Sequence, residues 1–412
     1  MSIRSLIRTT FGASPVAVVK VAALATLLSA CEMEPVAAPQ VPVEPPEIPV
    51  ALEWQEQASE LVATNRLSAL AAGRVYAALS MAQYRAVTRV DVDYPVSDGE
   101  PPMFASPSSA LGGRTLSETR RGAVGGASAR VLGVLFPAAA DQLALMLEEL
   151  GSNPGGSVHP HYRRGIAAGR AEAESVVQHL QNDGFTAQWD GTVPVGPGKW
   201  IPTSLPPAGV MLGSVTPWLL ASGSQFRPAP PPEYRSAAFD IDAAEVVSLS
   251  QSRTEAQLAF AKYWDFSAGT PTPIGYWNGT AAGYIANHGL DEAAATKVFA
   301  LMHAAVFDAL IGCWDAKYHY WLLRPSQAVE GVDLAFNVPN FPAYPSGHSC
   351  ASASAAKVLT YFFPGRASEL AKMVEDAGLS RILAGIHYRF DVTAGQQLGD
   401  RVAEWALEKG LE

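Results

Sequence analysis

Hydrophobic residues recur every three or four positions over much of the chain, which is the spacing of one buried face of an α-helix. One such face consists of Leu67, Leu70, Ala71, Val75, Ala78, Leu79 and Ala82. Similar helical patterns occupy residues 120–150, 163–183, 242–262, 291–323, 347–363 and 368–409. Alternation with a period of two, which is typical of strands, is scarce. The pattern therefore predicts an all-α fold, a helical bundle.

A Pro/Gly-rich stretch interrupts the helical pattern. Ten prolines lie between Asp190 and Glu233. The helices on either side show no sign of being self-sufficient, so this stretch predicts an irregular excursion over one bundle rather than a linker between domains. The small residues Ala351 to Ala356 would let one helix pack closely in a central position. We expect residues 51–412 to form a single helical catalytic domain.

The N-terminal segment has the layout of a secretory signal, with basic residues, no acidic residue and an apolar stretch from Val21 to Leu28. Leu28-Ser29-Ala30-Cys31 resembles the lipobox of bacterial lipoproteins, in which the cysteine is acylated. The alternative is an ordinary signal peptide with an incidental cysteine. We expect a signal peptide at 1–30 and a Pro-rich linker at 31–50. By resemblance to the known sorting pattern, Glu32 indicates a lipid-anchored protein of the bacterial outer membrane.

Composition narrows the class of protein further. Of the 412 residues, 48% are hydrophobic and 17% charged, which supplies a large core and excludes disorder of the whole chain. The net charge, 29 basic minus 39 acidic residues or −10, argues against a nucleic-acid binder. Three cysteines without a C-x-x-C pair exclude a disulfide scaffold. No window after the signal has 18 continuous apolar residues, so we expect membrane attachment through the lipid anchor only.

The first candidate segment for chemistry contains Lys317 and, seven residues later, Arg324, followed by Pro325. In a helix this separation is about 20° short of two turns, so the sequence places both cations on one face, with Pro325 ending the helix. Two cations this far apart usually belong to a solvated face. Here they lie among Trp and Tyr residues, which indicates a partly buried anion site.

The second segment is Pro345-Ser346-Gly347-His348. Ser346 is a natural N-cap, and the first turn at Gly347 and His348 exposes unpaired N–H groups that attract anions. The positive end of the helix disfavours the charged form of His348 unless an anion is bound. The alternative is a capped helix with an exposed histidine.

The third segment contains Arg381, His387 and Asp391. His387 and Asp391 are at i and i+4 of a predicted helix, so the carboxylate would orient one ring nitrogen and point the other at a substrate. Arg381 lies about 120° off that face, so it must reach around or Gly385 must bend the helix. A purely structural His–Asp hydrogen bond is the alternative.

Together the segments supply two histidines, one carboxylate, three cations and a helix N-terminus. This set fits an oxyanion: cations and N–H groups neutralise its oxygens, one histidine binds it axially and the other moves a proton. A zinc site is disfavoured because Asp391 is spaced to orient His387 rather than to ligate beside it. Cys313 and Cys350 lie near these segments, and we expect two buried thiols rather than a disulfide.

The pattern K-x6-RP, PSGH and SR-x5-H-x3-D, in this order, resembles the superfamily of type 2 phosphatidic acid phosphatases, class A acid phosphatases and vanadium-dependent haloperoxidases. The resemblance implies an α-helical bundle, His348 as acid/base and Asp391 as the group that orients His387. It implies that His387 is the vanadate ligand of a haloperoxidase or the phosphorylated nucleophile of a phosphatase. It also assigns oxyanion binding to Lys317, Arg324, Ser346, Gly347 and Arg381.

Within the superfamily, Phe341 to His348 reads FPAYPSGH, which resembles the fungal vanadium chloroperoxidases and makes Phe341 a halide-pocket candidate. A fainter likeness to secreted bacterial haloperoxidase-like proteins extends back through Gly275 to Asn278. We therefore expect a vanadate-dependent haloperoxidase that acts on peroxide and halide. The alternative is a soluble phosphatase that hydrolyses phosphate esters without a cofactor. The presence of His348 with the His387–Asp391 pair counts against an oxyanion-binding lipoprotein without turnover.

Overall fold

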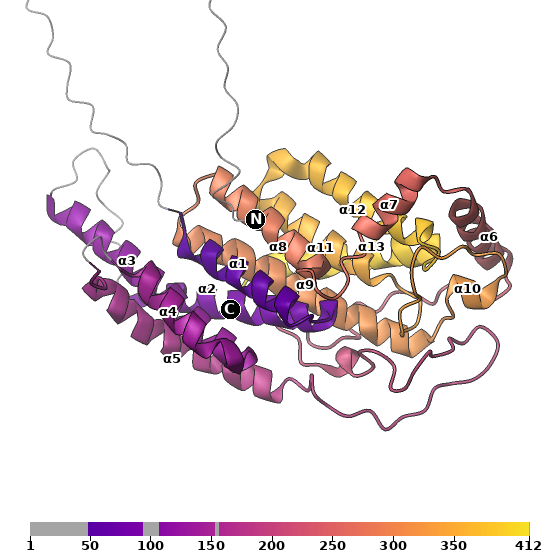
Figure 1. The fold of residues 1–412 in the computed structure, drawn as a ribbon, viewed down its shortest axis with the longest axis horizontal. Coiled ribbons are helices and arrows are strands. Elements are labelled where there is room, and N and C mark those ends of the chain that lie inside the picture. Colours follow the sequence, from indigo (N-terminus) through magenta and orange to yellow (C-terminus); the bar gives the residue numbers. More distant parts are fainter. Residues whose placement is uncertain (1–47, 94–106, 153–155, 412) are drawn as a thin grey trace, which may run out of the picture. The chain divides into compact units, whose positions relative to one another are not determined.

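The computed structural model describes residues 48–93, 107–152 and 156–411. The predicted signal peptide, Cys31 and the linker up to residue 47 lie outside these ranges. Within them the chain forms thirteen α-helices and no β-sheet, which confirms the all-α fold class (Figure 1). The helices are α1 (Val50–Thr64), α2 (Ala69–Asp93), α3 (Pro107–Leu135), α4 (Ala140–Leu150), α5 (Pro160–Asn182), α6 (Ala237–Ser252), α7 (Glu255–Tyr263), α8 (Thr272–Asn287), α9 (Glu292–Tyr320), α10 (Pro325–Ala328), α11 (Gly347–Phe362), α12 (Ala367–Leu383) and α13 (Arg389–Lys409).

The helices that the hydrophobic pattern predicts are present, but several are divided. The patterns at 120–150, 242–262 and 368–409 each correspond to two helices in the structure. Helix α8 is not among the predicted helices, because glycine at every fourth position from Gly275 to Gly283 weakens its helical signal. The periodicity therefore identifies apolar faces better than it identifies helix ends.

Helix α9 is the central helix, since its side chains are buried on nearly the whole circumference from Ala295 to Lys317. It begins at Asp291, whose carboxylate accepts the N–H of Ala294 at 2.9 Å. Among the described helices it alone is long and apolar enough to cross a membrane, with a mean hydropathy of 1.5. Because 89% of that window is buried inside the protein, α9 is the core helix of the bundle.

The other helices pack around α9 in two groups. Helix α2 packs on α9 and also on α3 and α5, which pack on each other, while α11 and α13 pack on α9 and on each other (Figure 1). The small residues from Ala351 to Ala356 are buried, as expected for a helix in close contact with its neighbours. Helices α9, α11 and α13 carry or flank all three candidate segments, so this packing brings the segments together.

The Pro/Gly-rich stretch is the irregular excursion that the sequence predicts. Between α5 and α6 it contains only a short 3-10 turn at Leu212–Ser214. Both carboxylate oxygens of the buried Asp308 in α9 accept N–H groups of Trp218, Leu219 and Leu220 at 2.7 to 2.9 Å. A few side chains of α9 thus fix this segment to the core.

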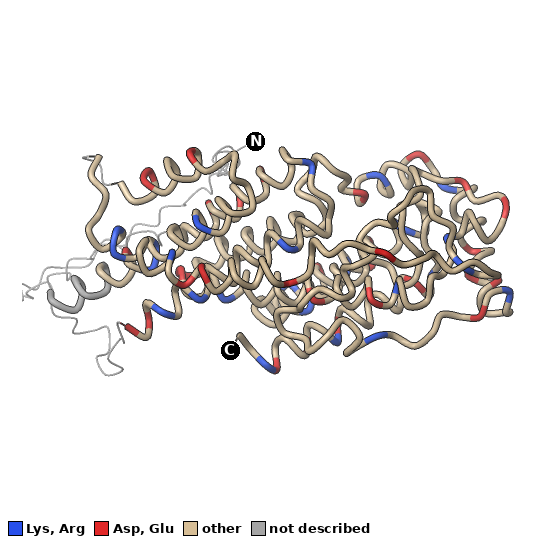
Figure 2. Tube along the Cα trace, turned by 90° about the horizontal axis from the view of Figure 1, so that it is seen from below, with Lys and Arg blue, Asp and Glu red and all other residues tan. Residues whose placement is uncertain are grey.

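Charged residues of both signs are interspersed along the described trace (Figure 2). Most of the ion pairs are on the outside of the bundle, for example Arg130 with Glu174 and Lys357 with Glu404. Such exposed pairs contribute little to stability, about 0–1 kcal/mol each. The cations of the candidate segments, Lys317, Arg324 and Arg381, are instead buried.

Candidate active site

Lys317 and Arg324 converge on one segment, although they do not share a helix face. Helix α9 ends at Tyr320, and Trp321 adopts a left-handed conformation with φ 56°. Arg324 is extended and precedes Pro325, which begins α10 rather than ending α9. The predicted common helix face is therefore wrong, because the chain turns between the two cations. Both side chains nevertheless reach the backbone of residues 341–345.

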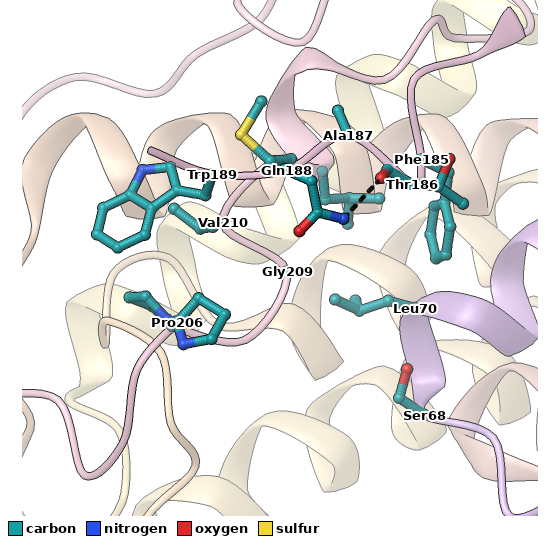
Figure 3. A pocket seen from close by; sticks show the side chains of 13 residues that line it. Ser68, Leu70, Phe185, Thr186, Ala187, Gln188, Trp189, Pro206, Gly209 and Val210 are labelled. Atoms are coloured by element: carbon teal, nitrogen blue, oxygen red, sulfur yellow. Dashed lines mark hydrogen bonds between the residues drawn. The ribbon is translucent and has the colours of Figure 1, made fainter. Parts of the chain in front are cut away.

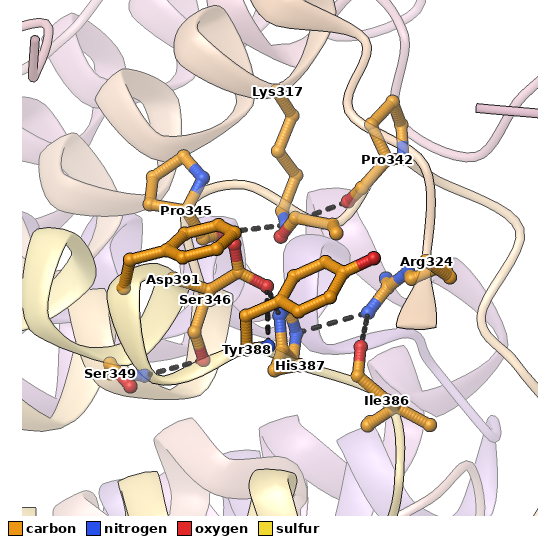
Figure 4. Close-up of polar contacts among 12 residues, drawn as sticks. Lys317, Arg324, Pro342, Pro345, Ser346, Ser349, Ile386, His387, Tyr388 and Asp391 are labelled. Atoms are coloured by element: carbon orange, nitrogen blue, oxygen red, sulfur yellow. Dashed lines mark hydrogen bonds and ion pairs between the residues drawn. The ribbon is translucent and has the colours of Figure 1, made fainter. Parts of the chain in front are cut away.

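The ammonium group of Lys317 is fully buried and already has three acceptors. Its Nζ donates to the carbonyl oxygens of Pro342, Ala343 and Pro345 at 2.9, 2.8 and 2.5 Å (Figure 4). These contacts use all three N–H groups of a lysine. In this structure Lys317 holds the segment that leads into α11, and a direct contact with an oxyanion requires it to release one carbonyl.

Arg324 is also fully buried, and one of its nitrogens has no partner among the described residues. Nε donates to the carbonyl of Phe341 at 3.0 Å, and Nη1 donates to the carbonyl of Ile386 at 2.7 Å and to His387 Nε2 at 3.1 Å (Figure 4). Nη2 makes no hydrogen bond. A buried donor without an acceptor is costly, and an anion oxygen would satisfy it.

His387 and Asp391 form the predicted pair, but only Asp391 is helical. Helix α12 ends at Leu383, Gly385 has φ +78°, and α13 begins at Arg389. His387 therefore lies in the connection, and the predicted i, i+4 helix face is wrong. Asp391 Oδ2 accepts from His387 Nδ1 at 2.8 Å and from the N–H of Tyr388 at 3.0 Å. The sequence left two possibilities, that Arg381 reaches around the helix or that the helix is interrupted at Gly385, and the structure shows the interruption.

The tautomer of His387 follows from its partners. An arginine can only donate, so the contact from Arg324 Nη1 places the lone pair of His387 on Nε2. The proton is then on Nδ1 and is donated to Asp391. Nε2 is thus a potential ligand or nucleophile, and an electrophile bound there would replace Arg324 as its partner.

Arg381 approaches the site from the last turn of α12. It is buried, with Nε donating to Ser380 Oγ at 2.9 Å and Nη2 to the carbonyl of Ala261 at 2.8 Å. Its Nη1 lies 3.7 Å from Asp265 Oδ1. Sequence reasoning missed Asp265, because a single aspartate in a connection after a helical pattern carries no motif.

The N-terminus of α11 is built as the sequence predicts. Ser346 is its N-cap, and Ser346 Oγ accepts the N–H of Ser349 at 3.4 Å. Gly347 and His348 form the first turn and are half-buried. His348 Nε2 lies 2.9 Å from the carbonyl of Trp264, an acceptor, so Nε2 carries the proton. Nδ1 of His348 then holds the lone pair that could accept a proton.

Burial shifts the pKa values of the whole cluster toward neutral forms. It lowers the pKa of Lys317 to about 8 and the pKa values of Arg324 and Arg381 to about 10. Burial, followed by the charge of Arg324, lowers the pKa of His387 well below its usual value. Burial and then Arg381 do the same to the pKa of His348. Burial raises the pKa of Asp391 to about 7.

A cavity of ≈ 220 Å³ reaches part of this cluster, and we refer to it as the catalytic cavity. Gly347, His348, Arg381 and His387 line it together with Asp265, whereas Lys317, Arg324 and Asp391 are not among its lining residues. We use the name polar floor for the buried polar cluster at this site: Lys317, Arg324, Arg381, His387 and Asp391. We use the name apolar wall for five of the apolar side chains that line the cavity: Leu70, Ile274, Leu310, Trp314 and Phe341.

Phe341 belongs to the cavity, as the sequence suggests for a halide-pocket candidate. Its ring packs on Trp314 with 5.0 Å between centroids. The guanidinium carbon of Arg324 and the ammonium of Lys317 lie 4.9 and 5.1 Å from the ring centroid. Phe341 therefore covers two cations of the polar floor and shields them from water.

The residues present fit an oxyanion such as vanadate or phosphate. Three buried cations outnumber the carboxylates of Asp391 and Asp265, so the site has a positive charge in excess even when Asp391 is ionised and both histidines are neutral. The unpartnered Arg324 Nη2 and the lone pair on His387 Nε2 are the groups that such an anion requires. No group of three or more His, Cys, Asp or Glu side chains suited to a metal ion occurs in the described part of the chain. Cys313 and Cys350 are free, buried thiols.

Comparisons with known proteins agree with this architecture. The structure is similar to that of the first bacterial vanadium-dependent iodoperoxidase, with a TM-score of 0.71 and 23% identity over 89% of this chain and 98% of that one. It is also similar to an apo-type bacterial vanadium-dependent chloroperoxidase, with a TM-score of 0.63 and 16% identity over 85% and 93% of the two chains. At these identities the likeness concerns the fold.

Sequence comparisons find matches in the C-terminal part of the chain. A model of the PAP2 superfamily matches residues 294–407, which contain all three candidate segments. Two non-specific acid phosphatases, from Salmonella typhi and Salmonella typhimurium, are 44% and 42% identical over 57 residues. These matches cover 14% of this chain and only 23% of the length of each relative. Residues 294–407 thus match the PAP2 superfamily, and the fold of the chain is similar to that of the bacterial vanadium haloperoxidases.

Proposed function

We propose that this protein is a haloperoxidase-like enzyme that oxidises halide with hydrogen peroxide, using vanadate bound at His387. The observation that carries the proposal is a cavity of ≈ 220 Å³ in which the apolar wall is joined by His348, Arg381 and His387. Apolar side chains favour a weakly hydrated halide over a hydrated ester. Ligand pockets for larger organic molecules are typically about 300–1,000 Å³, so this cavity suits an oxyanion with small reactants.

Each residue of the site has a role in this proposal. His387 Nε2 would hold vanadate, and Asp391 keeps that nitrogen unprotonated by accepting from Nδ1. Arg324 Nη2, Arg381 and the N–H of Gly347 bind oxyanion oxygens, while Lys317 and Ser346 hold the start of α11 in place. When bound, vanadate would activate peroxide toward halide without changing its own oxidation state.

His348 is the proton acceptor in the proposed reaction. Its Nε2–H is anchored on the carbonyl of Trp264, so Nδ1 is available to take the proton of peroxide. The lowered pKa of His348 keeps the imidazole neutral at pH 7, as a general base requires. The residues of the apolar wall exclude bulk water from this proton transfer.

The reaction is tested with purified full-length protein. Iodide and bromide oxidation by hydrogen peroxide should depend on added orthovanadate, and phosphate-ester hydrolysis is measured in parallel. Vanadate should activate halide oxidation and should inhibit any phosphate-ester hydrolysis that occurs. Vigorous ester hydrolysis with no halide oxidation at any vanadate concentration would refute the haloperoxidase proposal.

A phosphatase is the second candidate, favoured by the local 44% identity to a non-specific acid phosphatase. In that reaction His387 attacks phosphorus, His348 protonates the leaving alcohol and water then hydrolyses the phosphohistidine. The same floor serves both reactions because vanadate resembles the transition state of phosphoryl transfer. Trapping of a phosphohistidine after rapid acid quench distinguishes this candidate, since the haloperoxidase reaction forms none.

We further propose that the protein is anchored in the bacterial cell envelope by acylation of Cys31, in the outer membrane as Glu32 suggests. Two acyl chains would give stable anchoring. Cys31→Ser should move the protein from the membrane fraction to the soluble fraction. Retention of the variant in the membrane fraction would contradict the anchor.

A further inference from the structure

A second cavity of ≈ 490 Å³ lies next to the catalytic cavity, and we refer to it as the antechamber. Three segments form it: the start of α2, residues 185–189 and residues 206–212. Figure 3 shows the Gln188 side chain between the rings of Trp189 and Phe185 in this view. None of the side chains that line the antechamber is charged. An ionic ligand would therefore find no partner there, whereas a neutral ring would find aromatic and aliphatic contacts.

The antechamber and the catalytic cavity have three lining residues in common, Ser68, Leu70 and Gly209. Gly209 has φ +69°, and a Cβ atom there would lie 2.4 Å from Leu70 Cδ1 and 2.6 Å from Trp314 Nε1. Only glycine fits between these side chains. The two cavities are therefore neighbours that share single lining residues.

Side chains of α9 hold the shared wall of the two cavities in place. The carbonyl of Ala208 accepts hydrogen bonds from Trp314 Nε1 at 3.2 Å and from the hydroxyl of Tyr318 at 2.7 Å. The N–H of Ala208 donates to the carbonyl of Asn340 at 2.8 Å. The side of the antechamber formed by residues 206–212 is thus fixed to α9, which reduces the entropic cost of ordering that side on binding.

The two cavities differ in volume and therefore suit ligands of different size. The catalytic cavity, at ≈ 220 Å³, is smaller than typical sites for organic ligands, while the antechamber, at ≈ 490 Å³, is within their range. In the proposed reaction, the oxidising species forms next to the residues that the two cavities share. An organic acceptor placed in the antechamber would meet it there.

We propose that the antechamber binds a neutral, electron-rich aromatic compound of the phenol class as the halogen acceptor. This inference rests on the proposed haloperoxidase function. The rings of Trp189 and Phe185 would contact the aromatic ring, and the amide of Gln188 would hydrogen-bond its hydroxyl. The hypohalous acid HOX transfers its halogen to a ring carbon, the ring loses a proton, and the products are the halogenated phenol and water.

Binding is tested first and without turnover. The full-length protein, with neither vanadate nor peroxide, is titrated with 4-fluorophenol and observed by ¹⁹F NMR. Ala187 is exposed and lines the antechamber but not the catalytic cavity, so Ala187→Trp should fill the site and weaken binding at least about tenfold. Ala221→Trp is the matched control at an exposed position outside both cavities and should bind as the wild type does.

A second ligand tests the chemistry of the site. The anion 4-fluorobenzoate has a similar ring and should bind at least about tenfold more weakly than 4-fluorophenol, because the antechamber has no cation to pair with it. Equal binding of the two ligands, equal binding to wild type and Ala187→Trp, or no binding of 4-fluorophenol would each overturn the assignment.

Turnover then separates the two proposals. In Ala187→Trp the KM for phenol halogenation should rise while vanadate-dependent iodide oxidation is unchanged. An unchanged KM for the phenol would overturn the antechamber even where iodide is oxidised. Intact phenol binding with no halide oxidation in the wild type would instead defeat the proposed function and leave no halogen to transfer.

Discussion

The polar floor and the apolar wall of the catalytic cavity are organised in opposite ways. The floor comes from a short part of the chain, Lys317 to Asp391, and each of its side chains is fixed by hydrogen bonds. The wall is assembled from α2, α8, α9 and the segment before α11, and its members are apolar or aromatic side chains. The difference indicates that the floor determines whether chemistry occurs, while the wall determines which reactants enter.

The largest expected effect comes from removing the centre of the floor. His387→Ala should abolish vanadate-dependent halide oxidation, by at least about 10³-fold, because no other side chain offers an unprotonated nitrogen at that point. His319→Ala, at an exposed position on α9 outside the cavity, is the matched control. Activity is measured at saturating peroxide and orthovanadate. More than a tenth of wild-type activity in His387→Ala would mean that the floor is not the reaction centre.

A smaller loss is expected when the partner of His387 is changed. Asp391→Asn leaves the shape intact but no longer favours the proton on Nδ1 of His387. Loss of such an orienting partner typically costs about 10–100-fold in affinity or activity. Orthovanadate affinity by calorimetry and halide oxidation should fall together. A variant that binds and turns over as the wild type does would show the hydrogen bond to be structural only.

The same residue makes stability depend on pH. Burial raises the pKa of Asp391 from 3.8 to about 7, so the folded protein keeps this proton where the unfolded chain has lost it. The free energy of unfolding should therefore fall as the pH rises from about 4 to about 7. Urea unfolding at both ends of this range should show a smaller fall for Asp391→Asn than for the wild type. Identical falls would exclude this carboxyl as the cause.

The next prediction concerns the geometry of the Arg324 guanidinium group. Arg324→Lys keeps the charge but loses the unpartnered Nη2 and the contact with His387. A charge-assisted hydrogen bond contributes about 1.5–3 kcal/mol, so orthovanadate affinity should fall at least about tenfold. Calorimetry on the unloaded protein measures this directly. If the lysine variant binds with wild-type affinity, charge alone explains the site.

The smallest effect is expected in the wall. Phe341→Leu removes the ring over Arg324 and Lys317 and lets water approach the floor. Contacts of this kind contribute about 0.5–2 kcal/mol, so the KM for halide should rise a few-fold while orthovanadate affinity changes little. Steady-state kinetics with bromide and iodide give the comparison. If Phe341→Leu lost as much orthovanadate affinity as Arg324→Lys, the wall would contribute to anion binding as the floor does, and the proposed difference between them would be wrong.

The sequence predicted the polar floor far better than the wall. The motifs located all five floor residues, because the spacing of charged and histidine residues along the chain survives in the structure. The local geometry was wrong at two points, since the turns at Trp321 and Gly385 divide segments whose apolar pattern is continuous. Positive φ values at such turns depend on packing with distant residues. The spacing of hydrophobic residues along the sequence therefore cannot predict them.

Asp265 and most of the wall could not be predicted in this way. Leu70 and Ile274 are ordinary core residues by pattern, and only the packing of α2 and α8 on the bundle turns them toward the cavity. Phe341 was identified because it lies seven residues before His348 in a stretch that resembles a known family. Where the chain brings its groups together over hundreds of residues, only the fold reveals the site.

The clamp of Asp308 on residues 218–220 has a consequence for protein engineering. Together with the bond from the N–H of Trp200 to the carbonyl of Trp321, it divides the long irregular segment into short closed loops. Lengthening a single loop is cheap, about 0.6 kcal/mol for each doubling of its length. A peptide tag inserted at the exposed residues 190–192 would extend only one loop, so we expect it to be tolerated. The same tag at residues 218–220 would break the clamp and expose a buried carboxylate.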